Sequence, residues 1–130
     1  MKEVYDFLKK CEVFYIATID KDKPRVRPFG AVNIFENKLY IQTGKIKNVS
    51  KQMEINPNIE ICAYNDGKWL RIEAQVVIDD RKEAKISMLD TNPVLKNMYS
   101  AEDDNTEVLY LKKAKATFYS FTDKPRMVGF

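Results

Sequence analysis

The segment that organises this chain reads Tyr40-Ile41-Gln42-Thr43-Gly44-Lys45-Ile46-Lys47-Asn48-Val49-Ser50-Lys51-Gln52. An apolar run ends in a Thr-Gly turn and a segment with helical spacing follows, so the pattern predicts a strand that feeds a helix. The first N–H groups of a helix lack internal partners, and the helix dipole favours negative charge there. Thr43 adds a hydroxyl, and Lys45, Lys47 and Lys51 add positive charge. These residues predict an anion site, although an ordinary lysine-rich helix face fits them too.

The length and composition are those of a single globular domain spanning residues 1–130. With 45% hydrophobic and 32% charged residues, the chain has the material for a buried core. No internal repeat or Ser/Gly-rich linker divides it. The net charge of +3 is weak for a nucleic-acid-binding protein, so single-strand binding by the lysines is the least favoured function and we expect no nucleic-acid partner.

Residue types that the chain lacks narrow the chemistry further. It contains no histidine, and its two cysteines, Cys11 and Cys62, are far apart in the sequence. Zinc sites and histidine-based triads therefore lack their usual groups, and we expect no metal and two buried, reduced cysteines. No signal peptide and no apolar run of about 20 residues is visible, which predicts a cytoplasmic protein without a membrane partner.

The hydrophobic pattern predicts about six strands and a few short helices. Helices are expected at residues 2–10, from Gly44 to about Asn56, at 81–90 and at 93–98. Strands are expected at residues 12–19, 25–35, 38–43, 58–64, 68–78 and 107–121, the last interrupted at Lys112-Lys113. A polar loop is expected at 99–105 and an extended or loosely ordered tail at 122–130.

Several finer features follow from this pattern. In strand 68–78 the apolar face is Leu70, Ile72, Ala74, Val76 and Ile78. The helix after Gly44 is expected to bury Ile46, Val49 and Met53 on one stripe, and Asp79-Asp80 to cap the helix at 81–90. Asn65-Asp66-Gly67 is a strong hairpin signal. Short connections and the absence of GxGxxG favour a mainly β (α+β) fold, a small closed or partly closed antiparallel barrel with short flanking helices.

A second cationic segment is expected to reach the same corner of the molecule. Strands 25–35 and 38–43 would pair across the Glu36-Asn37 turn, which brings Arg25 and Arg27 close to Thr43. Two guanidinium groups, a hydroxyl and a helix N-terminus suit a phosphate monoester. For the arginines alone, a salt-bridged strand edge is the ordinary interpretation. Pro28 cannot donate to a ladder, so it predicts an edge, a bulge or a strand end.

Ordered motifs around this corner resemble those of a known family. The motifs are Phe14-Tyr15-Ile16-Ala17-Thr18, Lys23-Pro24-Arg25-Val26-Arg27-Pro28-Phe29-Gly30, Leu39-Tyr40-Ile41-Gln42-Thr43-Gly44, Lys47-Asn48-Val49, Asn56-Pro57 and Trp69-Leu70-Arg71-Ile72. In this order, over about residues 12–78, they resemble the pyridoxamine 5'-phosphate oxidase-like FMN-binding split barrels. The resemblance implies a six-stranded antiparallel split β-barrel that forms a homodimer with FMN at the subunit interface.

The resemblance also implies which residues would bind FMN. These cofactor-binding positions are Arg25, Val26, Arg27, Pro28, Gln42, Thr43, Lys47, Asn48, Lys51 and Trp69. Either Lys47 or Lys51 would meet the phosphate. Trp69 and Arg71 would contact the flavin or the partner subunit, whereas packing of the hairpin is the ordinary interpretation of Trp69.

The resemblance implies an FMN-dependent oxidoreductase that passes hydride between NAD(P)H and a small acceptor. Vitamin B6 oxidases end in an Arg/His-containing segment that holds the substrate phosphate, whereas this chain ends Asp123-Lys124-Pro125-Arg126-Met127-Val128-Gly129-Phe130. Oxidation of pyridoxamine 5'-phosphate is therefore not expected. The pattern singles out no catalytic side chain, because the flavin carries the chemistry. The alternative is a module that binds flavin, deazaflavin or haem without turnover.

Overall fold

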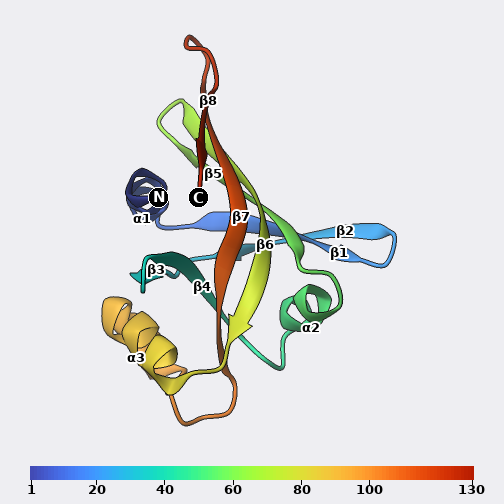
Figure 1. The fold of residues 1–130 in the computed structure, drawn as a ribbon, viewed down its shortest axis with the longest axis vertical. Helices are drawn as coiled ribbons and strands as arrows, with labels where there is room; N and C mark the ends of the chain where they lie inside the picture. Colours follow the sequence, from blue (N-terminus) through green and yellow to red (C-terminus); the bar gives the residue numbers. More distant parts are fainter.

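The computed structural model describes residues 1–130 as one large sheet with helices at its margins (Figure 1). The helices are α1 (Lys2–Cys11), α2 (Asn48–Ile55), α3 (Lys82–Thr91) and the 3₁₀ helix η1 (Pro93–Asn97). The strands are β1 (Phe14–Asp20), β2 (Lys23–Phe29), β3 (Val32–Phe35), β4 (Lys38–Gly44), β5 (Asn58–Asn65), β6 (Lys68–Asp79), β7 (Thr106–Ser120) and β8 (Arg126–Gly129). None of the helices is long and apolar enough to cross a membrane.

All strand pairs are antiparallel, in the order β2-β1-β5-β6-β7-β4-β3, with β8 paired to β7. The sheet is not closed, because β2 and β3 stand at the two ends of this path. The mainly β, antiparallel fold with flanking helices is confirmed. The sheet has 8 strands rather than about six, since the expected strand 25–35 divides at Gly30 and the tail supplies β8.

Strand β6 runs through the middle of the sheet, and its alternation explains the main core. Leu70, Ile72, Ala74 and Val76 are buried on one face, in a core to which α1 and α2 also contribute. The predicted apolar face ends one residue pair early: Ile78 is 38% exposed, whereas Asp79, on the opposite face, is buried. The reason is that a second, smaller core of Ala31, Tyr40, Ala84, Met88 and Val108 lies under α3 at this end of the sheet.

Two of the predicted irregularities have a simple form in the structure. Strand β7 continues through Lys112-Lys113, where Lys113 has a φ of 52° and the register with β6 shifts between Glu73 and Gln75. This interruption is thus a β-bulge within one strand. The Asp66-Gly67 turn has positive φ at both residues, the geometry that a two-residue hairpin requires.

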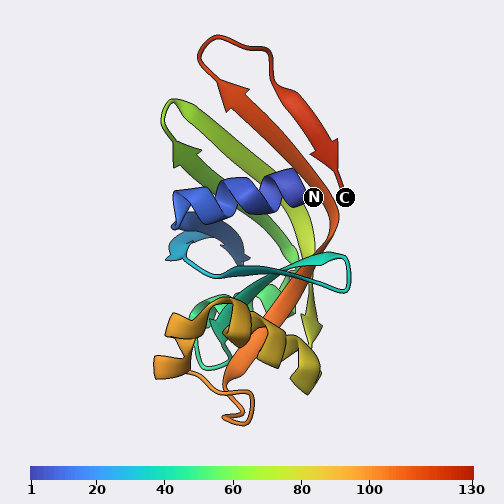
Figure 2. The same cartoon turned by 90° about the vertical axis from the view of Figure 1, so that its left-hand side faces the viewer.

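The three-dimensional layout is clearest from the side, where α1 crosses one half of the sheet and α3 the other (Figure 2).

Three finer predictions are wrong. Ile46 is 76% exposed, because α2 begins only at Asn48 and Ile46 lies in the turn before it. Cys62 is exposed, because its neighbours on β5 face the core; both cysteines are nevertheless free. Asp79 and Asp80 do not cap α3, whose N-cap is Arg81 without a side-chain cap. Asp79 instead accepts hydrogen bonds from the backbone and guanidinium of Arg81.

Candidate functional site

The expected corner forms, but by a different route from the predicted hairpin. Of the expected strand 25–35, only the part that forms β3 pairs with β4, and Gly30 separates it from β2. Strand β2 pairs along its whole length with β1, so that Arg27 lies opposite Ile16. Pro28 therefore sits in an edge strand, one of the three predicted settings, where a missing N–H is tolerated. Arg27 reaches the end of β4 through space rather than through strand pairing.

Two hollows meet at this corner, on either side of Arg27 and Lys47. The inner hollow, about 270 Å³, lies between the end of β4 and η1. The outer hollow, about 460 Å³, lies between the β1–β2 hairpin and the start of α2. Both are lined by Arg27, Lys47 and Val49. Other predicted site residues line only one of the hollows. The inner hollow is also lined by Pro28, Gln42 and Thr43, and the outer hollow is also lined by Arg25, Val26 and Asn48.

Arg27 carries a half-buried positive charge that no carboxylate neutralises. Its guanidinium donates to neutral oxygens only, among them Ile16 O at 3.1 Å, Thr18 Oγ1 at 2.7 Å and Gln52 Oε1 at 2.7 Å. Burial, and secondly the charge of Arg25, lowers the pKa of Arg27. The other arginines all pair with carboxylates: Arg25 with Asp20, Arg71 with Glu60, Arg81 with Asp79 and Glu36, and Arg126 with Glu3. An anion placed beside Arg27 would supply the missing countercharge.

The start of α2 provides further donors, shifted from their predicted place. The N–H groups of Lys45 and Ile46 are already bonded to the backbone and side-chain oxygens of Asn105. The helix begins instead after Lys47, the N-cap, and no side chain caps it. The N–H groups of Asn48 and Val49 therefore have no partner within the helix, and both residues line the outer hollow.

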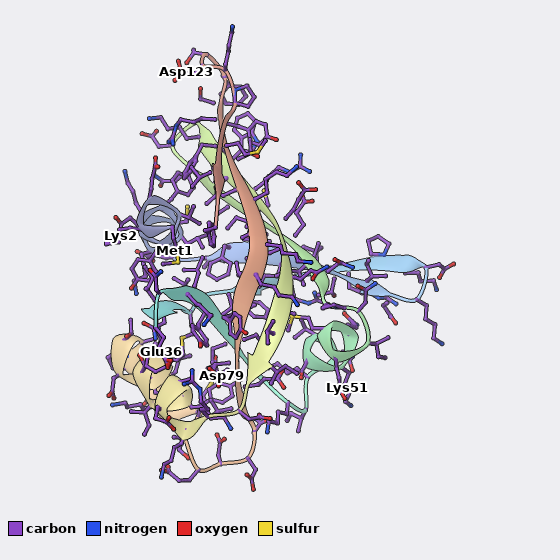
Figure 3. The ribbon with its side chains drawn as sticks, in the orientation of Figure 1. Met1, Lys2, Glu36, Lys51, Asp79 and Asp123 are labelled. Carbon is purple, nitrogen blue, oxygen red and sulfur yellow. The ribbon has the colours of Figure 1, made fainter.

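Two predicted residues lie outside both hollows. Lys51 is exposed on α2 and points away from the sheet (Figure 3), so Lys47 rather than Lys51 reaches the corner. Trp69 stacks on Tyr119, with ring centroids 5.4 Å apart, and contacts Phe121 near the tips of two hairpins. Within this chain its role is hairpin packing. Arg71, on the same side, is paired with Glu60.

Other residues at the corner were not predicted. Gln52 lines the outer hollow, and it was foreseeable because it lies one helical turn after Asn48. Thr18 bonds to both Arg27 and Gln52. One wall of the inner hollow comes from η1 and the residues around it, namely Asn92 and the largely apolar Val94, Leu95, Met98 and Tyr99. No local pattern connects that segment to the corner, since only the tertiary structure brings it there.

Gly44 marks a close approach between the corner and the loop before β7. A Cβ atom at Gly44 would lie 3.0 Å from the Asn105 side chain and 3.3 Å from the Tyr99 hydroxyl. We expect Gly44→Ala to displace this loop and to reduce the free energy of unfolding by about 1 kcal/mol, because overpacking forces neighbours to move. Urea denaturation measures the loss. Gly129→Ala is the control, because a Cβ there makes only an ordinary contact at 3.8 Å and no loss is expected.

Known proteins share this fold over nearly the whole chain. The family profile of pyridoxamine 5'-phosphate oxidase matches residues 1–120. A NimC/NimA family protein from Clostridium acetobutylicum is 45% identical, with a TM-score of 0.97 over 100% of this chain and 92% of that one. General Stress Protein 26 from Bacillus anthracis is 18% identical, with a TM-score of 0.77 over 99% of this chain and 97% of that one. The haem storage protein HutZ from Vibrio cholerae is 16% identical, with a TM-score of 0.66 over 85% of this chain and 87% of that one. No curated protein matches the sequence.

Proposed function

Because this chain belongs to the pyridoxamine 5'-phosphate oxidase family, we propose that the corner shared by the two hollows binds the phosphate of FMN. The observation that carries the proposal is the charge of Arg27, which is half-buried and has no carboxylate partner. Lys47 and the free N–H groups of Asn48 and Val49 add donors beside it. This set contains donors and positive charge, which is the chemistry that a phosphate dianion needs.

The rest of the cofactor would use the inner hollow and the strand that leads to it. Pro28, Phe29 and Gly30 line that hollow beside Gln42 and Thr43, and they offer apolar surface and side-chain polar groups. A bound flavin supplies hydride acceptance and donation, whereas the protein orients it and excludes water. We propose that the protein is an FMN-dependent oxidoreductase, passing hydride between NAD(P)H and a small acceptor.

The carboxyl-terminal segment argues against oxidation of pyridoxamine 5'-phosphate. Arg126, the only arginine near the chain end, is paired with Glu3 and lies over the Phe118 ring at 4.8 Å. It therefore braces β8 against α1 and is not free to hold a substrate phosphate. The chain has no histidine either. The acceptor is accordingly proposed to be a different small molecule.

Titration with FMN and riboflavin tests the cofactor. We expect the purified protein to quench FMN fluorescence and to keep the yellow colour through gel filtration. Riboflavin should bind at least tenfold more weakly, because charge-assisted hydrogen bonds to the phosphate contribute about 1.5–3 kcal/mol each. A protein that stays colourless after incubation with FMN would refute the proposed cofactor.

Mixing the FMN-loaded protein with NADH or NADPH in the absence of air separates an enzyme from a carrier. Bleaching of the yellow colour is expected for an oxidoreductase, because reduced flavin loses the visible band. Persistent colour with both nucleotides would favour the alternative, a module that binds a flavin or deazaflavin without turnover. Free FMN with the same nucleotides is the control for the uncatalysed reaction.

Haem is the other cofactor to consider, because HutZ is a haem storage protein of this fold. Haem iron is usually held by histidine, cysteine, methionine or tyrosine side chains. This chain has no histidine, and its cysteines line neither hollow, which leaves Met98 and Tyr99 of the inner hollow as possible ligands. FMN is the cofactor we propose, because the uncapped start of α2 adds backbone N–H donors of the kind that a phosphate uses.

We also propose that two copies of the chain associate, with the flavin between them. The aromatic cluster of Trp69, Tyr119 and Phe121 supports this proposal. It lies outside both hollows, and the Phe121 ring is 80% exposed although it is apolar. A second copy would cover this aromatic surface. Sedimentation equilibrium should then give twice the 15.2 kDa mass of one chain. A monomer at micromolar concentration would contradict the proposal.

A further inference from the structure

Thr18 and Gln52 surround the guanidinium of Arg27 with neutral oxygens. The Thr18 hydroxyl donates to Gln52 Oε1 at 2.6 Å and accepts from Arg27 Nη1 at 2.7 Å. Gln52 Oε1 accepts a second bond, from Arg27 Nη2 at 2.7 Å. The three residues come from β1, β2 and α2, so this closed ring of bonds ties three elements together at the corner. We call Thr18 and Gln52 the neutral cage.

The ring holds the guanidinium without using up its charge. Thr18 is 2% exposed, so its hydroxyl is a fixed, buried acceptor rather than a mobile surface group. None of the hydrogen bonds of Arg27 uses Nε, and the amide nitrogen of Gln52 makes no hydrogen bond. Both residues line the outer hollow, so a ligand there lies next to donors that the protein itself does not use. A carboxylate at position 52 would make the same two bonds and also neutralise the arginine.

We propose that Thr18 and Gln52 are positioning residues that orient Arg27 and keep its charge available, so that the site prefers a phosphorylated ligand over its dephosphorylated form. The inference rests on the proposed function, because FMN and riboflavin are the ligand pair in question. It adds two residues, neither of them a predicted contact of the cofactor, that set the selectivity for the phosphate. An uncharged acceptor is needed because a carboxylate would compete with the phosphate for the same guanidinium.

The decisive variant is Gln52→Glu, which is nearly isosteric. A merely structural Gln52 would tolerate it, because the carboxylate accepts the same bonds from Thr18 and Arg27. We expect unchanged or higher stability in urea, but FMN affinity at least tenfold lower, as for the loss of one charge-assisted hydrogen bond. Riboflavin affinity should not change. Gln75→Glu is the matched control for charge, because Gln75 lies on β6 outside both hollows, and it should leave the FMN affinity as it is.

A second pair of variants tests the other half of the cage. Thr18→Val removes the hydroxyl but keeps the shape, so Arg27 loses one anchor and FMN affinity should fall about fivefold, the equivalent of one ordinary hydrogen bond. Thr18→Ser restores the hydroxyl and should recover the affinity. If Thr18→Val does not fold, Gln52→Glu decides the question by itself.

Inorganic phosphate serves as a flavin-free probe and separates the two proposals. It should raise the melting temperature of the wild type but not that of Gln52→Glu. If the wild type binds FMN and Gln52→Glu binds it with equal affinity, the proposed role of the neutral cage is overturned and the proposed function stands. If phosphate raises the melting temperature of the wild type but not of Gln52→Glu, and the wild type does not bind FMN, the proposed function is overturned and the role of the neutral cage is supported. Wild type that responds to neither ligand would overturn both.

Discussion

Replacing Arg27 with glutamine is expected to lower the affinity for FMN by roughly 100-fold, because up to two charge-assisted hydrogen bonds of about 1.5–3 kcal/mol each are lost. Arg27 is the one arginine of this chain without a carboxylate partner, so its charge is available to a ligand. Glutamine keeps a polar side chain at the junction of the two hollows and removes only the charge and the guanidinium fork. Quenching of FMN fluorescence measures the affinity.

Arg25→Gln is the matched control, two residues away on the same strand. Arg25 is exposed and already bonded to Asp20 at 3.1 Å, so its charge is largely compensated. We expect its loss to weaken FMN binding by no more than about fivefold, the range of an exposed ion pair. Riboflavin, which lacks the phosphate, should bind both variants as it binds the wild type. Equal effects of the two substitutions on FMN would show that Arg27 has no special role.

The second large expected effect is a loss of stability, at a hydrogen-bond network around Asp79, the last residue of β6. Asp79 is 8% exposed and accepts hydrogen bonds from the Tyr40 hydroxyl at 2.7 Å and from Arg81 at 2.9 to 3.1 Å. Arg81 in turn bonds to Glu36, which lies in the turn between β3 and β4 (Figure 3). The network joins β4, the end of β6 and the start of α3 around the smaller core.

Asp79→Asn is expected to reduce the free energy of unfolding by about 2–3 kcal/mol, because a buried network loses its central charge. Urea denaturation followed by circular dichroism measures the change. Glu60→Gln is the control, because it breaks the exposed pair with Arg71 and should cost less than about 1 kcal/mol. Comparable losses in the two variants would contradict a special role for the buried network.

The same network gives the stability a defined pH dependence. Hydrogen bonds from Arg81 and, after the opposing effect of burial, from Tyr40 lower the pKa of Asp79 from 3.8 to about 2. A carboxyl whose pKa is lowered by folding stabilises the protein above its unfolded pKa. The contribution, on the order of 2 kcal/mol, should therefore be lost as the pH falls from about 4 to about 2. In Asp79→Asn this part of the acid transition should be missing.

A weaker effect in the same acid range is expected at the loop that packs on Gly44. Burial alone would raise the pKa of Asp103, but hydrogen bonds from Thr106, Ser100 and Asn105 outweigh it and lower the pKa to about 2. Protonation of Asp103 should release Asn105, which holds the N–H groups of Lys45 and Ile46. Acid should therefore loosen this turn as well.

Much of the fold follows from local rules that a sequence carries openly. Alternation in β6 specifies which face is buried, and the Asp66-Gly67 turn specifies a two-residue hairpin. Pro28 predicts an edge, a bulge or a strand end, and the structure has it in an edge strand. Asn56-Pro57 predicts the end of α2. Each of these features depends on a few neighbouring residues, and each was predictable for that reason.

The electrostatic character of the corner depended on tertiary structure. Periodicity tells which face a residue occupies, but not which strand pairs with it; the pattern therefore predicts pairing of residues 25–29 with β4, whereas their partner is β1. Whether Arg27 is a neutralised edge residue or a free charge depends on oxygens from Ile16, Thr18 and Gln52, which only the packing of α2 against β1 brings to it. Local sequence patterns are enough to place most of the strands, their turns and a cationic corner. That one of the charges at this corner has no counterion follows from the packing, because it depends on contacts between residues up to 34 positions apart.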